Sequence, residues 1–388
     1  MLSAQLSYDI TDWLNISGRV RVDNTHTKYE QKLYASSNLT ITEESTQGHY
    51  TISKPDETQT YADVLANINK RFNDFSLVAN VGASIVNNRY EDLSYRGPIR
   101  EKGIPNVFNV FDLDNTKKKA RQDEWQEQTQ SVFASVEVGW KSMLYLTLTG
   151  RNDWALQLAN SSTPCFFYPS VGLSGVISEM LTLPEFIDYM KVRGSFSSVG
   201  MPYPRNLTSP TYEYDEANQQ WKPKTHYPIK DLKPERTNSW ELGLDMRLFK
   251  DFSLGFSWYL ANTFNQTFDP KVSVSSGYSK IYLQTGYVRN SGVELSLGYG
   301  HTWNNHLHWE SNFTLSHNKN TIKDLVTSYI HPETGLPITQ NRLDVGGLGK
   351  ARFILKKGGT LGDLYTQSDL KRDNSGMVEI DPSRCADY

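Results

Sequence analysis

The sequence predicts an all-β fold, specifically an antiparallel transmembrane β-barrel of which about twelve strands are present. Three observations lead to this prediction: strict alternation of apolar and polar residues, runs longer than ordinary strands, and connections that alternate between short and long. Hydrophobic residues make up 38% of the 388 residues and aromatic residues 12%, with a mean hydropathy of −0.55. These values disfavour a bundle of membrane-spanning helices.

Alternation is clearest at the start of the chain, where Leu2, Ala4 and Leu6 alternate with Ser3 and Gln5. A strand places such alternate residues on opposite faces. The runs with this pattern are 2–10, 14–22, 60–70, 75–85, 132–140, 144–148, 166–177, 192–196, 240–248, 252–260, 293–299 and 309–315. The longer runs reach the roughly 9–11 residues that a strand needs to cross a bilayer, whereas strands of globular proteins are most often about 5–6 residues long.

The connections between these runs fall into two classes. Tight turns are expected at 11–12, 73–74, 141–142, 249–251 and 301–306. Long polar segments are expected to be loops at 23–58, 87–129, 152–165, 200–236, 262–288 and from 317 onward. Short and long connections alternate, as in outer-membrane barrels. The segment 178–190 is an exception, because it begins with a short helix-like stretch where a tight turn is expected.

The polar residues of each strand are predicted to face a wet interior, because charge on a lipid-facing wall is costly. This set comprises Glu137, Thr147, Arg151, Arg193, Glu241, Asp245, Arg247, Glu294, Glu310 and Asn312. In the hairpin 239–260, Leu244 and Phe256 are expected on the lipid face and Asp245 and Ser257 inside. Aromatic residues near strand ends, as interfacial girdles require, are Trp13, Trp140, Trp240, Trp258 and Trp309.

Several stretches of the sequence form distinct motifs. They are Gly150–Trp154 (GRNDW), Phe167–Ser174 (FYPSVGLS) with Ile177–Glu179, Tyr189–Phe196 (YMKVRGSF) with Val199–Gly200, Leu232–Glu235 (LKPE) with Ser239–Asp245 (SWELGLD), Arg289–Leu297 (RNSGVELSL) and Gly358–Tyr365 (GGTLGDLY). In these stretches the sequence resembles SusC/RagA-type TonB-dependent outer-membrane transporters. The stretches occur in the family's order and cover most of the chain. The sequence departs from the family at Met201, where an asparagine is usual, and at Ser197–Ser198, which replace a Tyr-Gly pair.

By this resemblance, residues 1–388 are expected to be a single partial barrel domain in the cell outer membrane of a Gram-negative bacterium. A signal peptide, carboxypeptidase-like domain, plug and final C-terminal strands are expected to be missing from it. The implied function is TonB-energised import of an oligosaccharide, a peptide or a similar nutrient. The implied partners are a SusD-like surface lipoprotein, TonB through the missing N-terminal region, the glycan or peptide ligand, and outer-membrane lipid.

Two alternatives remain at this stage. One is a TonB-dependent receptor for a siderophore or vitamin, which the neighbouring genes and the plug would distinguish. The other is a soluble β-rich carbohydrate-binding or hydrolytic protein, which the strand lengths disfavour. Nucleic acid is not an expected partner, because 40 basic and 43 acidic residues give a net charge of −3 without a basic excess.

No catalytic, cofactor or metal site is predicted, so the chain is not expected to be an enzyme. Gly346–Lys350 lacks the pattern of a phosphate loop, because Asp344 and Ala351 occupy positions that require Gly and Ser or Thr. Cys165 and Cys385 are far apart in the sequence and have no metal-ligand spacing. The histidines at 301, 306, 308 and 317 are interpreted as exposed turn residues, and the strand carboxylates as polar residues of the interior.

The candidate residues for binding a substrate or a partner are aromatic and lie in one long loop. They are Tyr203, Tyr212, Tyr214, Trp221 and Tyr227. Aromatic rings suit sugar rings or peptide side chains, and the nearby Pro202 and Pro204 reduce the entropy lost on binding. The alternative is that these rings pack against one another or against a partner protein.

Overall fold

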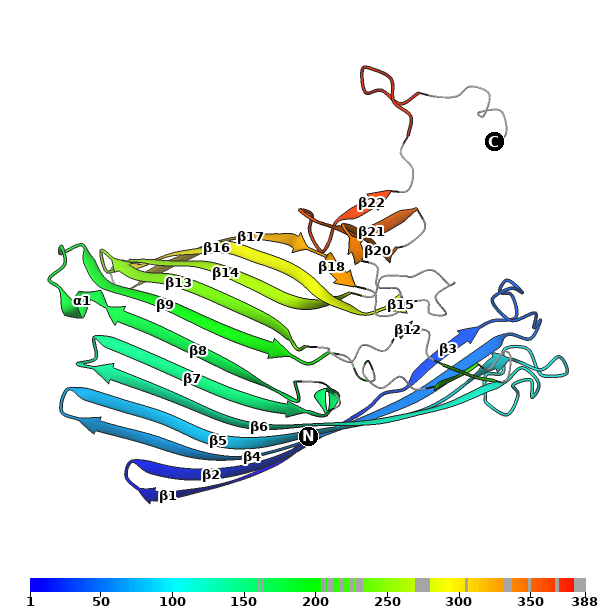
Figure 1. Cartoon of the computed structure of the whole chain (residues 1–388), viewed down its shortest axis with the longest axis horizontal. Helices are drawn as coiled ribbons and strands as arrows, with labels where there is room; N and C mark the ends of the chain where they lie inside the picture. Colours follow the sequence, from blue (N-terminus) through cyan, green and yellow to red (C-terminus); the bar gives the residue numbers. More distant parts are fainter. Residues whose placement is uncertain are drawn as a thin grey trace.

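The computed structural model describes residues 1–159, 161, 163–203, 205, 207, 212–215, 220–223, 226–227, 233–268, 280–303, 306–330, 337–347, 350–366 and 370–379. A curved antiparallel sheet of 13 strands dominates the fold (Figure 1). Twelve of them form one continuous path: β1 (Leu2–Thr11), β2 (Leu14–His26), β4 (His49–Phe72), β5 (Phe75–Pro98), β6 (Lys119–Trp140), β7 (Leu144–Ala155), β8 (Cys165–Val176), β9 (Ile187–Met201), β13 (Glu235–Leu248), β14 (Phe252–Phe268), β16 (Leu283–Trp303) and β17 (Leu307–Asp324). The short strand β3 (Tyr29–Leu33) pairs with β4. The predicted all-β, antiparallel class and the predicted number of strands are confirmed.

Connections of the two classes lie at opposite ends of the sheet (Figure 1). At one end, here called the turn end, consecutive strands are joined by the short turns that the sequence predicts. Two of these turns place pairs of residues other than glycine in the left-handed region, Lys141 and Ser142 (φ 50° and 59°) and Phe249 and Lys250 (φ 51° and 65°). Left-handed pairs match the twist of a hairpin. The other end, the loop end, carries the long connections.

The predicted irregular connection at 178–190 is present and docks on the neighbouring turn. It contains the short helix α1 (Ile177–Met180). Phe186 stacks on Phe249 with ring centroids 5.6 Å apart, and the Phe249 N–H donates to the Phe186 carbonyl. The Lys250 N–H donates to the Asp188 carboxylate at 2.6 Å. These contacts show why this connection is longer than its counterparts: it fills the space beside the next hairpin.

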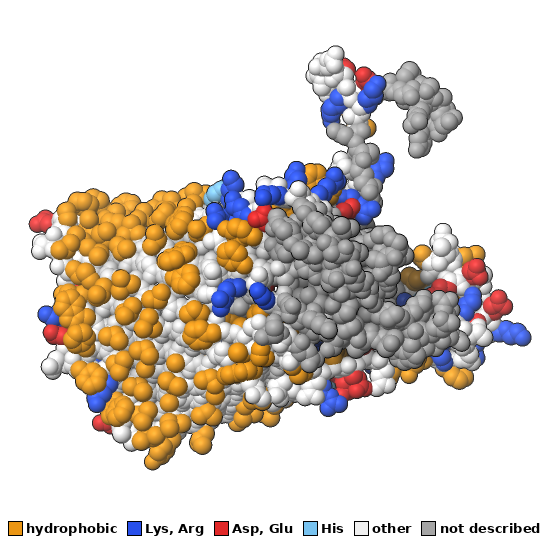
Figure 2. Space-filling view, viewed as in Figure 1, with side chains coloured by type: hydrophobic (Ala, Val, Ile, Leu, Met, Phe, Trp, Pro, Cys, Tyr) orange, Lys and Arg blue, Asp and Glu red, His pale blue; other side chains and the backbone are white. Residues whose placement is uncertain are grey.

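The register places the apolar rows on one face of the sheet, as predicted. Leu244 is paired with Val192 on one side and Phe256 on the other, while Asp245 is paired with Lys191 and Gly255. The apolar rows are substantially exposed: Val64 is 59% and Leu242 56% exposed. Figure 2 shows hydrophobic side chains gathered over the half of the molecule at the turn end. A band of apolar side chains that no protein atom covers is the outer surface expected of a wall in contact with lipid.

The strands at the loop end are longer than the sequence predicts. Residues 49–58, 87–98 and 119–129 fall in segments predicted as loops, but they belong to β4, β5 and β6, which are 24, 24 and 22 residues long. The prediction was wrong here because it depended on apolar alternation. Above the lipid-facing band both faces meet water, so the alternation ends although the hydrogen-bond ladder continues.

Smaller elements lie at the loop end or follow β17. They are η1 (Leu156–Leu158), β10 (Tyr212–Asp215), β11 (Gln220–Pro223), β12 (His226–Tyr227), β15 (Lys280–Ile281), β18 (Val326–Ile330), β19 (Pro337–Gln340), β20 (Arg342–Gly346), β21 (Ala351–Lys356) and β22 (Leu364–Thr366). The sheet β20–β22 packs on the main sheet through buried Leu343 and Leu355, which join Phe268, Val288 and Ile322 in one cluster.

Two long connections fold together into a compact structure, here called the loop knob (residues 34–48 and 99–118; the blue and cyan loops beyond β3 in Figure 1). Ile99 and Leu113 are each 1% exposed and form a bridge between the two ends of the second connection. The Ser45 hydroxyl donates to the Ile99 carbonyl at 2.7 Å. These two connections are therefore structured, although the sequence predicts only polar segments.

Two further findings concern the membrane. No helix in the described ranges is long and apolar enough to cross a bilayer. Within the same ranges no pairing joins β1 to β17, so the sheet is an open wall.

Arginine substitutions on the two faces test the orientation of the wall. Leu244→Arg is expected to cost about 2–4 kcal/mol and to impair assembly, because it places a charge in lipid near mid-depth. The control is Ser195→Arg on the neighbouring strand β9. Ser195 pairs with Glu241 in the ladder and lies on the inner face, three residues along β9 from Val192, the partner of Leu244. This substitution is expected to be tolerated. Heat-modifiable gel mobility of the full-length protein measures both. Equal damage from the two substitutions would contradict the assignment of faces.

Candidate functional site: the inner mouth of the wall

The inner face of the sheet carries polar residues on many of its strands, with single apolar side chains such as Phe133 among them. One row runs through Arg193, Gly243, Ser257 and Glu294, which are successive partners across β9, β13, β14 and β16. In each strand the residues directly before and after this row point to the outer face. The polar residues predicted to line the interior on these strands are therefore confirmed on the face opposite the apolar band.

Three arginines of this inner face are held by nearby acceptors. Arg19 pairs with Asp63 at 2.6 Å. Arg151 donates to the Asp153 carboxylate at 2.7 Å and to the Ser131 hydroxyl at 2.8 Å. Charge-assisted bonds of this kind fix the side chain as well as neutralise its charge.

Arg193 is held most fully of the three. It donates to Asp245 and to Ser257, each at 2.8 Å, and lies 3.5 Å from Glu241. A Cβ atom at Gly243 would lie 2.5 Å from the Arg193 Nε. Glycine at 243 therefore allows the guanidinium to lie flat across the neighbouring strand and reach Ser257.

The connection after β9 folds back onto the inner face at the loop end. Tyr203 and Leu207, each 5% exposed, pack against Ala155, Leu158 and Phe166. Ala155 and Phe166 belong to the inner rows of β7 and β8. Tyr203, a predicted binding residue, is thus an anchor of this connection. Its hydroxyl is buried and has no hydrogen-bond partner among the described groups.

Arg205, two residues further on, reaches the inner face of β6. Its guanidinium lies 3.8 Å from the centroid of the Trp125 ring, and its Nε is 2.6 Å from a Glu127 carboxylate oxygen. Trp125 in turn stacks on Tyr90, with centroids 5.3 Å apart and an interplanar angle of 13°. We call Tyr90, Trp125, Glu127, Tyr203 and Arg205 the inner mouth.

The surroundings of the inner mouth are acidic. Tyr90 lies on β5 above the lipid-facing band, directly opposite Glu57 on β4. Burial, and next to it the carboxylate of Asp92, raise the pKa of the Tyr90 hydroxyl above its ordinary value. A negative field of this kind favours cations at the mouth.

The other predicted binding residues lie in short strands. Tyr212 and Tyr214 are in β10 and Trp221 is in β11, where Tyr214 and Trp221 are direct partners in the antiparallel register. Tyr227 is in β12, which pairs with β15 in parallel through Ile281. The structure therefore places three of the five residues on one two-stranded sheet, and Tyr227 on another.

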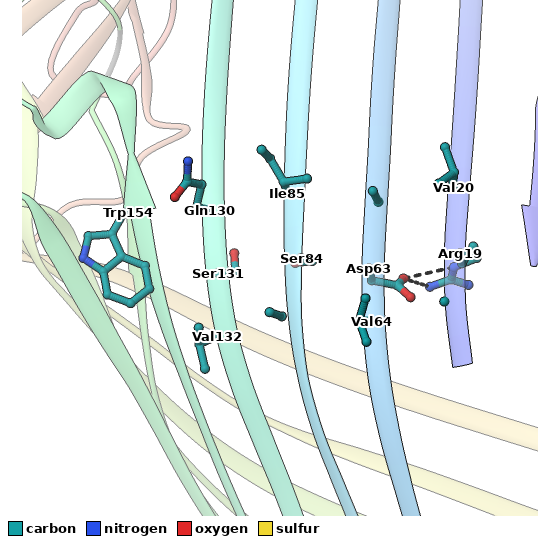
Figure 3. A pocket seen from close by; sticks show the side chains of 13 residues that line it. Arg19, Val20, Asp63, Val64, Ser84, Ile85, Gln130, Ser131, Val132 and Trp154 are labelled. Atoms are coloured by element: carbon teal, nitrogen blue, oxygen red, sulfur yellow. Dashed lines mark hydrogen bonds and ion pairs between the residues drawn. The ribbon is translucent and has the colours of Figure 1, made fainter. Parts of the chain in front are cut away.

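A shallow groove crosses the outer, lipid-facing side of the wall (Figure 3). It lies over the small residues Gly18, Ala62 and Ala83, between larger side chains that include Ile85 and Trp154. Because its rim consists of outer-row residues such as Val20 and Val64, which are 50% and 59% exposed, the groove opens toward lipid. It is not part of the inner mouth.

The remaining reactive groups form no site within the described residues. No cluster of three or more His, Cys, Asp or Glu residues suited to a metal occurs there. His301 pairs with Asp251 at 2.7 Å, and a His308 ring nitrogen lies 2.9 Å from the Thr302 hydroxyl. Cys165 is a free thiol, and Cys385 lies outside the described residues.

The sequence prediction missed Tyr90, Trp125, Glu127 and Arg205. All four fall in segments predicted as loops, 87–129 and 200–236. One signal could have found two of them: Trp125, Glu127 and Thr129 alternate in phase with the inner-row residues Ser131 and Phe133 further along the strand. Nothing in the sequence indicates that Arg205 meets them.

Comparison with known proteins gives the family. The profile of the family described as "TonB dependent receptor-like, beta-barrel" matches residues 1–374. Two TonB-dependent receptors of Formosa agariphila are similar: P39 is 23% identical over 82% of this chain, and P26 is 25% identical over 56%. The chain spans 29% and 23% of the lengths of these two relatives.

Solved structures agree on the fold. The RagAB peptide transporter superposes on 92% of this chain and 38% of its own, with a TM-score of 0.72 at 16% identity. The siderophore receptor PiuA of Acinetobacter baumannii covers 87% of this chain and 48% of its own, with a TM-score of 0.52 at 14% identity. The resemblance to SusC/RagA-type proteins is confirmed, and the chain belongs to the TonB-dependent receptor β-barrel family of the outer membrane.

Proposed function

We propose that residues 1–388 form one partial barrel domain of a TonB-energised importer, which takes up an oligosaccharide, a peptide or a similar nutrient together with a SusD-like surface lipoprotein. The proposal concerns the whole protein. The chain described here spans 29% and 23% of the lengths of the two relatives from Formosa agariphila. In this proposal the protein binds and gates its ligand and performs no covalent chemistry.

The observation that carries the proposal is the two-faced wall with a folded connection in its mouth. The outer rows are apolar and exposed, whereas the inner rows hold arginine and carboxylate side chains in paired networks. The connection after β9 is anchored on the inner face, where a solute entering the lumen would meet it. Aromatic and charged side chains in this position suit a polar nutrient with some flat or apolar surface.

Two comparisons support a nutrient importer over a siderophore or vitamin receptor. The fold superposes better on the RagAB peptide transporter than on PiuA, with TM-scores of 0.72 and 0.52. The sequence motifs quoted above resemble the SusC/RagA group. The soluble alternative is disfavoured by the outer rows, because more than a dozen half-exposed apolar side chains on one wall would face water.

Growth of a strain that lacks the complete gene tests the proposed function. The wild type is expected to outgrow the deletion strain when a peptide mixture or an oligosaccharide is the limiting nutrient, and a tonB mutation is expected to abolish the difference. A growth defect confined to iron limitation would instead favour the siderophore receptor.

Replacing the four predicted loop aromatics other than Tyr203 tests their role in binding. A variant with Tyr212, Tyr214, Trp221 and Tyr227 all changed to Ser is expected to reduce uptake at least about tenfold, because each aromatic ring that a ligand covers contributes roughly 1 kcal/mol or more to binding. Assembly is expected to be unchanged, since long surface connections tolerate change. Tyr29→Ser, at a 52% exposed tyrosine of β3, is the matched control. Uptake that stays normal would mean that these rings only pack.

The anchor at Tyr203 is expected to respond to ring size and not to its hydroxyl. Tyr203→Phe keeps the packing and removes a buried hydroxyl without a described partner, so local stability is expected to be unchanged or up to about 1 kcal/mol higher. Tyr203→Ala is expected to lower it by about 3–5 kcal/mol, as for other buried aromatic truncations. Hydrogen exchange of residues 155–168 measures both variants. Equal protection in the wild type and the alanine variant would show that the ring is not an anchor.

A further inference from the structure

The Arg205 side chain contacts β6 in the way that a bound guanidinium ligand would, with one aromatic ring and one carboxylate. Its guanidinium lies on the face of the Trp125 ring at 3.8 Å and forms an ion pair with Glu127 at 2.6 Å. Ring and carboxylate belong to the same strand and the same face, two residues apart. Arg205 belongs to a connection outside the ladder, and its side chain is still 34% exposed.

The Trp125 ring and the backbone of Glu127 are held independently of Arg205. Trp125 is backed by Tyr90, its direct partner on β5, with which it stacks at 5.3 Å. Glu127 is the partner of Asn88 in the same ladder, and its side chain is 20% exposed. Strands β5 and β6 pair continuously from Phe75–Trp140 to Arg96–Lys119. The ladder and the stacked Tyr90 ring therefore keep Trp125 and the backbone of Glu127 in place if Arg205 moves away.

The charge of the surrounding face favours a cation. The carboxylates of Glu57, Asp92 and Asp123 lie on the same inner face close to Tyr90. Arg121 pairs with Asp123 at 2.8 Å and offsets its charge, whereas Asp92 accepts a hydrogen bond from the neutral Ser53 hydroxyl at 2.8 Å. The negative charge beside Tyr90 therefore comes mainly from Glu57 and Asp92. An aromatic face beside a carboxylate suits a guanidinium better than an ammonium, because the planar group can stack and donate at the same time.

We propose that Tyr90, Trp125 and Glu127 form a binding site for the guanidinium group of an arginine-containing peptide, and that Arg205 occupies this site until such a peptide displaces it. The inference deepens the proposed function, on which it rests, by naming a chemical class of substrate. A tethered competitor acts at an effective concentration in the millimolar range, so the intact protein binds a single arginine weakly. Displacement would remove the contacts of Arg205 with β6 and leave Tyr203 and Leu207 packed in their own cluster.

Isothermal titration of the purified full-length protein in detergent tests the site directly. The probe is the capped peptide acetyl-Gly-Gly-Arg-Gly-Gly-amide, and the control peptide carries citrulline, which has the shape of arginine without its charge. Arg205→Ala is expected to bind the arginine peptide about tenfold more tightly than the wild type, since a competing stacking contact and ion pair are removed. Adding Glu127→Gln is expected to cancel that gain, and the citrulline peptide is expected to show none.

A matched control separates the site from a general effect of losing an arginine. Arg100 in the loop knob also lies over a ring, that of Phe111 at 5.2 Å, and pairs with Asp112 at 2.6 Å. Arg100→Ala is expected to leave peptide affinity unchanged. The proposal is overturned if Arg205→Ala binds no more tightly than the wild type, if the citrulline peptide gains equally, or if Arg100→Ala gives the same gain.

The outcome is separable from that of the proposed function. Nutrient uptake by cells that express the wild-type gene is measured in parallel. Uptake that persists while the titrations show no gain for Arg205→Ala would remove the guanidinium site and leave the importer. A gain in the titrations together with absent uptake would remove the importer and leave the site.

Discussion

The structure depends on one constraint: in a bilayer every backbone N–H and C=O group must find its partner within the protein. Between its two edges the main sheet meets this constraint by pairing neighbouring strands in one uninterrupted path from β1 to β17, whose outer edges have no pairing among the described residues. Once strands are paired side by side, each residue is committed to one of two faces. The apolar rows then face lipid and the polar rows face the lumen, and the arginine networks of the inner face follow from this division.

The same constraint explains which features the sequence could predict. Where one face meets lipid, alternation is strict, and runs such as 75–85 and 252–260 predict both the strands and their faces. Where both faces meet water, the ladder is still required but the apolar signal is absent, so the upper parts of β4, β5 and β6 were predicted as loops. The packing of the loop knob likewise depends on isolated residues such as Ile99 and Leu113, which no periodicity marks.

The candidate site was predicted less well than the fold. The sequence indicated the loop from its aromatic residues, and the structure buries one of them, Tyr203, as an anchor. The contact between Arg205 and Trp125 joins residues 80 positions apart in the chain and depends on how a long connection folds back. Composition can show that a loop is rich in rings, whereas only the fold decides which ring packs and which remains available.

The arginines of the inner face differ in how many contacts hold them. This difference distinguishes a structural arginine of the wall from one that a ligand can displace. Arg193 belongs to a strand with partners on both sides, and three acceptors on β13 and β14 surround its guanidinium. Moving it would leave carboxylates unpaired and break contacts along two strands. Arg205 has one ring and one carboxylate, and its backbone belongs to no strand of the ladder. Exchanging its guanidinium for another of the same chemistry keeps the Trp125 ring and the Glu127 carboxylate occupied, and the displaced Arg205 side chain, already 34% exposed, passes to water. A ligand shifts an equilibrium by the difference in its affinity for the two states, and a ligand that refills the contacts of Arg205 leaves fewer groups unpaired than one that displaces Arg193.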